Sequence, residues 1–133
     1  MEIKRVLIID DEESIQTVVK FGINMAAGWD VLTASSGPQG IYTAQSELID
    51  VILLDVMMPE MDGIATFHAL KTYPKTEEIP VIFLTAKAQT AEKNHFNDLG
   101  VSGVITKPFN SLDLPGQISK ILHWELQSWK FYS

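Results

Sequence analysis

The sequence contains no cysteine, which excludes disulfide bonds, thiolate catalysis and cysteine-based zinc sites. It also lacks long hydrophobic runs, because stretches such as Val6–Ile9 and Val51–Leu54 are far too short to cross a membrane. Basic residues are few: ten Lys and Arg stand against seventeen Asp and Glu, and the net charge is −7. Nucleic-acid phosphates repel such a surface, so we expect no direct contact with DNA or RNA.

A length of 133 residues suits one compact domain and is too short for two ordinary ones. No signal peptide precedes the first apolar run, so we expect a cytoplasmic protein without membrane contact. No glycine-rich G-x-G-x-x-G motif follows that run, which leaves a dinucleotide site without support.

Short apolar runs alternate with segments of helical periodicity along the chain. The runs predict strands at 6–9, 29–32, 51–54, 81–84 and 104–105, each followed by a helix, with Ser111 as the cap of the last one. Continuous apolar strands that alternate with helices favour an α/β fold, a doubly wound five-stranded parallel sheet with helices on both faces. We expect the flavodoxin-like strand order 2-1-3-4-5, because it places the two most apolar runs in the middle.

Four of the predicted strands end in residues that can carry chemistry. Asp10 and Asp11 follow the first run, Asp55 the third, Thr85 the fourth and Lys107 the fifth. Ligands of an open parallel sheet bind beyond the carboxyl ends of its strands, so these side chains are expected to converge on one edge.

Three carboxylates cannot gather there without cations. Two like charges about 4 Å apart repel by about 4 kcal/mol at an effective dielectric constant near 20. Lys107 supplies one positive charge, and Mg²⁺, which prefers carboxylate oxygens and shares phosphate oxygens, would balance the remainder. Such a site can place a phosphoryl group on an aspartate. We assign Asp55 as the nucleophile, Asp11 as a direct metal ligand and Asp10 as a ligand through water.

The sequence resembles the receiver domain of two-component response regulators from about residue 4 to about residue 122. The resemblance is carried by four segments in order, which read VLIIDDEESI, VILLDVMMPEMDGI, PVIFLTAKA and GVITKPFNSLDL. It implies that Asp55 accepts a phosphoryl group from a sensor histidine kinase or a phosphotransfer protein. It also implies that Mg²⁺ is held by Asp11, Asp55 and the backbone carbonyl of Met57, with Asp10 behind them.

The resemblance assigns further roles near the phosphoryl group. Thr85 would be the switch hydroxyl, Lys107 the phosphate contact, and the Lys107–Pro108 peptide bond would be cis. Receivers usually carry Tyr or Phe three residues before the lysine, but this chain has Val104, so the usual coupling of hydroxyl to aromatic ring is in question. Signalling would use protein contacts at the face formed by the fourth helix, fifth strand and fifth helix.

Two other interpretations stay open. A Mg²⁺-dependent phosphatase that works through an aspartyl phosphate would want a carboxylate two residues after the nucleophile, where Met57 stands. A degenerate interaction domain that is never phosphorylated is favoured only by Val104. We therefore expect no enzyme beyond phosphorylation and dephosphorylation of the chain itself.

The C-terminal segment is a separate question. We place the receiver domain at 1–122 and interpret 123–133 as an extension of the last helix or a tail, since Ile118, Leu122, Leu126 and Trp129 continue one stripe. Trp124 falls off that stripe and is predicted to be exposed, which suggests a partner contact or a homodimer through the C-terminal aromatic residues.

Overall fold

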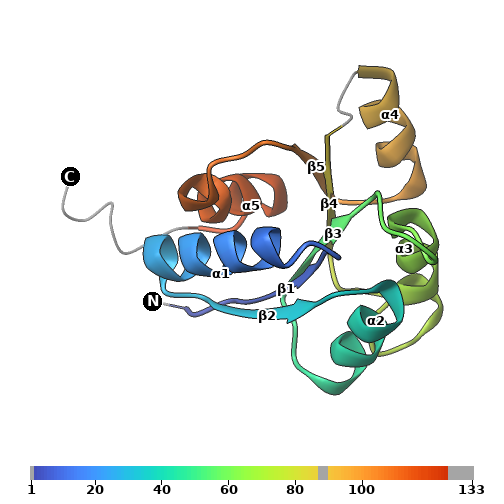
Figure 1. Cartoon of the computed structure of the whole chain (residues 1–133), viewed down its shortest axis with the longest axis horizontal. Helices are drawn as coiled ribbons and strands as arrows, with labels where there is room; N and C mark the ends of the chain where they lie inside the picture. Colours follow the sequence, from blue (N-terminus) through green and yellow to red (C-terminus); the bar gives the residue numbers. More distant parts are fainter. Residues whose placement is uncertain (1, 87–89, 126–133) are drawn as a thin grey trace.

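A computed structural model describes residues 2–86 and 90–125 of the chain. Strands and helices alternate in the order β1 (Arg5–Ile9), α1 (Glu13–Ala27), β2 (Asp30–Ala34), α2 (Gly37–Ser46), β3 (Val51–Asp55), α3 (Gly63–Thr72), β4 (Val81–Thr85), α4 (Thr90–Leu99), β5 (Gly103–Thr106), the 3₁₀ helix η1 (Ser111–Asp113) and α5 (Leu114–Leu122). Helices α1 and α5 cover one face of the sheet, and α2, α3 and α4 cover the other (Figure 1). The predicted fold class is confirmed.

The five strands form one parallel sheet in the predicted order β2-β1-β3-β4-β5. β1 and β3 lie in its interior, and their central residues are fully buried. Because all strands run in the same direction, their carboxyl ends, and the polar residues that follow them, meet at one edge.

Two apolar cores lie on opposite sides of the sheet, and β3 contributes to both. Val51 and Leu53 pack with Ile23 of α1 and Ile118 of α5. Ile52 and Leu54 pack on the other side, in the core formed with α2, α3 and α4. This alternation follows from the strand geometry, in which successive side chains point to opposite faces. A continuous apolar run is therefore what a strand covered on both faces requires.

The start and stop signals predicted from the sequence are confirmed for α1 and α2. Gly28 ends α1 in the left-handed conformation at φ 70°. The Ser36 side chain accepts from the Gln39 N–H at the start of α2, beside the proline predicted near the first helical position. The prediction for the last helix is wrong: Ser111 begins the 3₁₀ helix η1, which Asn110 caps by accepting from the Leu112 N–H, and α5 follows from Asp113 without a side-chain cap. Within the described residues, no helix combines the length and apolarity that crossing a bilayer requires.

Of the two interpretations given for 123–133, the helical extension does not hold at 123–125, and the tail stays a prediction. His123 adopts a left-handed conformation at φ 61°, and the Trp124 N–H turns back to the Ser119 carbonyl at 2.8 Å. Trp124 is half-buried rather than exposed, because its ring packs edge-on against Trp29 at 5.8 Å and lies under the Lys4 ammonium. The contact of Trp124 with Trp29 thus takes the place of the further helical turn that the apolar stripe predicted.

The other aromatic residues predicted for an interface, Trp129, Phe131 and Tyr132, lie outside the described residues. The domain boundary at residue 122 and a homodimer through this region stay predictions.

Candidate functional site

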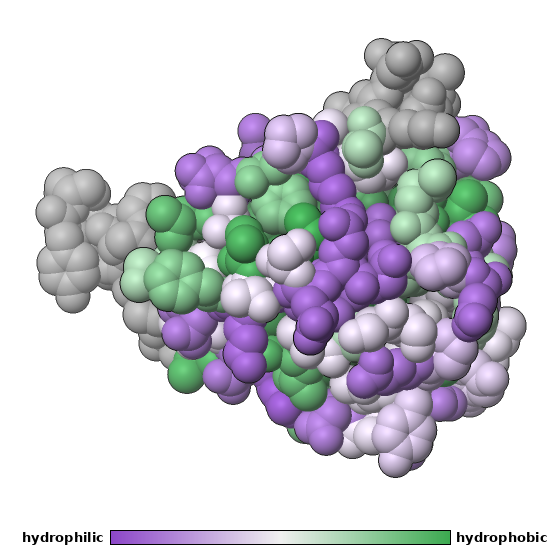
Figure 2. All heavy atoms as spheres, viewed as in Figure 1, coloured by the Kyte–Doolittle hydropathy of each residue, from purple (hydrophilic) through white to green (hydrophobic). Residues whose placement is uncertain are grey.

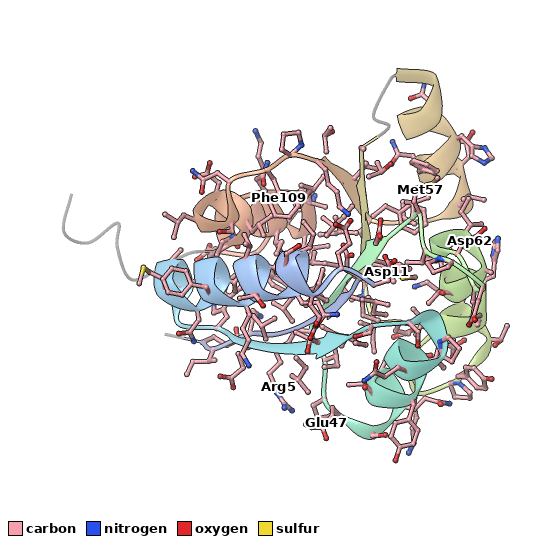
Figure 3. The ribbon with its side chains drawn as sticks, viewed as in Figure 1. Arg5, Asp11, Glu47, Met57, Asp62 and Phe109 are labelled. Atoms are coloured by element: carbon pink, nitrogen blue, oxygen red, sulfur yellow. The ribbon has the colours of Figure 1, made fainter. Side chains whose placement is uncertain are left out.

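Three carboxylates meet at the carboxyl ends of β1 and β3. Each of Asp10, Asp11 and Asp55 offers an oxygen within 4.8 Å of the others, and we call these three residues the acidic cluster. Asp10 and Asp55 are buried, with 0% and 3% of their surface exposed, whereas Asp11 is exposed. Figure 3 shows Asp11 and Met57 on neighbouring loops at this edge. The predicted convergence is confirmed for all three acids.

Lys107 reaches the acidic cluster from the loop after β5. Its ammonium lies 3.1 Å from Asp10 Oδ2 and 3.4 Å from Asp55 Oδ1. Its backbone N–H donates to the Thr85 carbonyl at 2.8 Å, which fixes the start of the loop beside β4. Burial lowers the pKa of Lys107, but the hydrogen bond and charge of Asp10 together with Asp55 outweigh it, so the pKa is raised. Lys107 is therefore a permanent cation.

The charge balance at Asp55 is unfavourable in the absence of a metal. Burial, assisted by the neighbouring charge of Asp10, raises the pKa of Asp55 from 3.8 to about 6, although Lys107 and the Met57 N–H act in the opposite direction. One lysine thus fails to compensate three carboxylates. The remaining formal charge of −2 is the charge that one divalent cation would neutralise.

The oxygens of the acidic cluster are used unequally. Asp10 employs both, because Oδ1 accepts from the Glu12 N–H at 2.9 Å and Oδ2 pairs with Lys107. Asp55 places its contacts with the Met57 N–H and Lys107 on Oδ1, and within residues 2–86 and 90–125 its Oδ2 stays available to a metal or phosphoryl group. This arrangement supports the prediction that Asp11 and Asp55 ligate directly and Asp10 acts through water.

The donor set fits Mg²⁺. Carboxylate oxygens are hard ligands, and Mg²⁺ combines one or two of them with water and phosphate oxygens. The exposed Asp11 leaves room for that water. Met57 has its side chain in solvent, 63% exposed, and its backbone carbonyl as a ligand stays a prediction.

Thr85 ends β4 at the same edge and is 1% exposed. The structure therefore brings its strand end beside Lys107, as predicted. The Lys107–Pro108 bond is cis, also as predicted. Val104 is half-buried and packs against the core of the α2, α3 and α4 side, paired with Phe83 across the sheet.

The family profile for the response regulator receiver domain matches residues 6–119. The chain belongs to the response regulator receiver family. This receiver is 36% identical over 119 residues to the alkaline phosphatase synthesis transcriptional regulatory protein PhoP of Bacillus subtilis (strain 168), covering 90% of this chain and 48% of the relative. The receiver thus spans about half the length of the curated relatives that it matches, such as PhoP and, at 36% identity, the DNA-binding dual master transcriptional regulator RpaA of Synechocystis.

Solved structures share the receiver fold. The chemotaxis protein CheY4 of Vibrio cholerae superposes with a TM-score of 0.82 and 30% identity, over 90% of this chain and 99% of that one. Receiver domains bind Mg²⁺ at an acidic site, and the acidic cluster occupies that place in this chain.

Two residues that pack beside the acidic cluster escaped the sequence analysis. Gln16 lies in α1 and reaches the Asp10 carbonyl with its side chain. Gly63 begins α3 directly against the backbone of Asp55 and Val56. A polar residue within a helix and a glycine after a loop give no signal by themselves, because both roles depend on contacts that only the folded chain creates.

Proposed function

We propose that this receiver accepts a phosphoryl group on Asp55 with Mg²⁺ and signals through protein contacts. The observation that carries the proposal is the position of Asp55. It is buried at the end of the central strand β3, and two more carboxylates and a lysine lie beside it. The Asp55 carboxylate would attack phosphorus, forming a P–O bond as the bond from phosphorus to the donor histidine nitrogen breaks.

Each neighbouring residue has a task in that reaction. The Lys107 ammonium would stabilise the negative charge that develops on the phosphoryl oxygens, and the Thr85 hydroxyl would donate a hydrogen bond to one of them. Asp11, Asp55 and the Met57 carbonyl would hold Mg²⁺, with Asp10 behind them through water. The bound metal would supply positive charge to the transferring group.

Mass measurement after incubation with a small acyl phosphate and Mg²⁺ tests this function. We expect a species about 80 Da heavier, the mass of one phosphoryl group, which disappears in Asp55→Asn and when Mg²⁺ is chelated. Asp30→Asn is the matched control, because it neutralises an exposed carboxylate at the start of β2. An unmodified wild-type mass would favour the degenerate interaction domain, and rapid multiple turnover of free substrates would favour the phosphatase.

Output is proposed at the face formed by α4, β5 and α5. Phosphorylation adds negative charge and acceptor oxygens at Asp55, which would draw the Thr85 loop and Lys107 toward the group. Thr85 precedes α4 in the chain, and Lys107 lies between β5 and α5, so a movement of either residue would reach this face. Val104 in β5 packs in the core, so the response must proceed without a rotating aromatic ring at this position.

The proposed phosphodonor is a sensor histidine kinase or a phosphotransfer protein, in the cytoplasm. The matched region covers 48% of PhoP and of RpaA, and the DNA binding in the name of RpaA is a property of that longer protein. The absence of direct nucleic-acid contact by residues 1–133 stays a prediction.

An exposed apolar stripe on α1, the helix that starts next to the site, offers a docking face for that donor. α1 begins two residues after Asp11, and Val18, Phe21 and Met25 are exposed by 47%, 62% and 64% along it. Apolar atoms gather over this part of α1 in Figure 2. An exposed apolar stripe on a helix is typical of a protein interface, and this stripe runs from the middle of α1 toward the end that lies away from the acidic cluster.

Phe21→Asp is expected to slow phosphotransfer from the cognate kinase at least tenfold, because a charge replaces a central apolar contact. Phosphorylation by the small acyl phosphate should be unchanged, since that donor needs no docking face. Tyr42→Asp is the control, because Tyr42 is an exposed aromatic residue on α2, on the opposite face of the sheet. Equal effects of the two variants on kinase transfer would contradict this docking face.

A further inference from the structure

The parallel ladder between β1 and β2 ends next to the acidic cluster. Its pairs run from Arg5 with Asp30 to Ile9 with Ala34, and a last backbone bond joins the Asp10 N–H to the Ala34 carbonyl at 3.0 Å. Beyond this bond the chain after β1 enters the loop that carries Asp10 and Asp11, which we call the acidic loop, whereas the chain after β2 turns toward α2. Asp10 is fully buried, so its own carbonyl needs a donor that the ladder no longer supplies.

Gln16 provides that donor from α1. Its Nε2 donates to the Asp10 carbonyl at 2.7 Å and to Ser35 Oγ at 3.0 Å. An amide nitrogen carries two N–H donors, so both are used. Gln16 is 9% exposed, and it joins the end of β1, the start of α1 and the loop after β2.

A second glutamine completes the junction without touching Asp10. Gln39 in α2 accepts from the Ser35 N–H through Oε1 at 2.7 Å. The two glutamines therefore replace ladder partners where β1 and β2 separate. Of these two glutamines, Gln16 is the one that contacts Asp10.

We propose that Gln16 is a positioning residue for the cation site, a role that rests on the proposed function. The Asp10 carbonyl and the Asp11 N–H belong to one planar peptide unit. A hydrogen bond that holds the carbonyl therefore also fixes the orientation of the Asp11 backbone nitrogen. Asp11 is exposed, and the backbone is what directs its carboxylate toward Asp55. A ligand held in place before the metal arrives loses less conformational freedom on binding.

Gln16→Met tests the role, because methionine has a similar length but no N–H donor. Calorimetric titration should show Mg²⁺ affinity reduced about five- to twentyfold, whereas the phosphorylation rate at saturating Mg²⁺ stays within about twofold of the wild type. Gln39→Met is the matched control, and its Mg²⁺ affinity should equal that of the wild type. Melting temperatures in chelator, and the amide spectra of Asp11 and Glu12, verify that the variants are folded at the assay temperature and show where the loop has changed.

Three results would overturn the inference. One is wild-type Mg²⁺ affinity in Gln16→Met, and another is the same loss in both glutamine variants, which would indicate a general loosening of the junction. The third is a rate at saturating Mg²⁺ that falls as much as the affinity does. A wild-type chain that binds Mg²⁺ but takes no phosphoryl group would refute the proposed function alone, and the Mg²⁺ affinities of the variants would still decide the role of Gln16.

Discussion

Asp55→Asn is expected to stabilise the metal-free domain by up to about 3 kcal/mol at pH 7. The pKa of Asp55 rises from 3.8 to about 6 on folding because the carboxylate is buried beside Asp10, and each unit corresponds to about 1.4 kcal/mol. Asparagine keeps the shape of the side chain and removes the charge. Lys107 stays paired, since Asp10 is its nearer partner.

The sign of the pH dependence follows from linkage. Between pH 4 and 6 the folded state holds a proton on Asp55 that the unfolded state has lost, so wild-type stability falls as pH rises and then levels off. The difference between the variant and the wild type should therefore grow from near zero at pH 4 to its full value by pH 7. Saturating Mg²⁺ should shrink it, because the metal compensates the wild-type carboxylate.

Urea unfolding of both proteins in chelator and in Mg²⁺, at pH 4 and pH 7, measures these differences. Asp30→Asn again serves as the control for loss of an exposed acid. A variant less stable than the wild type at pH 7 in chelator would show that Asp55 carries no uncompensated charge.

Gly63→Ala is expected to destabilise the domain by about 3 kcal/mol and to slow phosphorylation of Asp55. A Cβ at this position would lie 2.7 Å from Val56 Cα and closer still to the Asp55 carbonyl oxygen. Both are backbone atoms that cannot rotate away, so α3 or the end of β3 must shift. Such a shift also strains the bond from the Gly63 N–H to the Val56 carbonyl.

Gly116→Ala is the matched control for this substitution. Gly116 lies in α5, and a Cβ there would meet nothing within 4 Å. Alanine should stabilise the helix by about 0.5–1 kcal/mol. If urea unfolding gave Gly63→Ala the same sign as Gly116→Ala, the close packing of α3 on the phosphorylation strand would be disproved.

The framework of the site follows from sequence because few alternatives satisfy it. Apolar runs of strand length ending in Asp55 and Lys107 must be parallel when helices separate them, and parallel strands bring their carboxyl ends together. The end of the last helix could not be read in this way. Leu122 and Leu126 continue a helical stripe, but Trp124 gains more by packing on Trp29, which is 95 residues away in sequence.

Gln16 shows a different limit of sequence reasoning. Its partners are a backbone carbonyl and a serine hydroxyl on two separate loops, and neither contact leaves a pattern in the order of residues. Polar contacts of this kind depend on where the strands separate, which is a property of the assembled sheet.

The packing of Trp124 on Trp29 determines what the fluorescence of these two tryptophans can report. Both indole rings lie at the start of β2, and a strand of five residues spans about 16 Å, so they sit roughly that far from the acidic cluster. Their emission should follow unfolding and the detachment of the C-terminal turn. Occupancy of the cluster needs a signal other than these two rings, such as heat or an introduced dye.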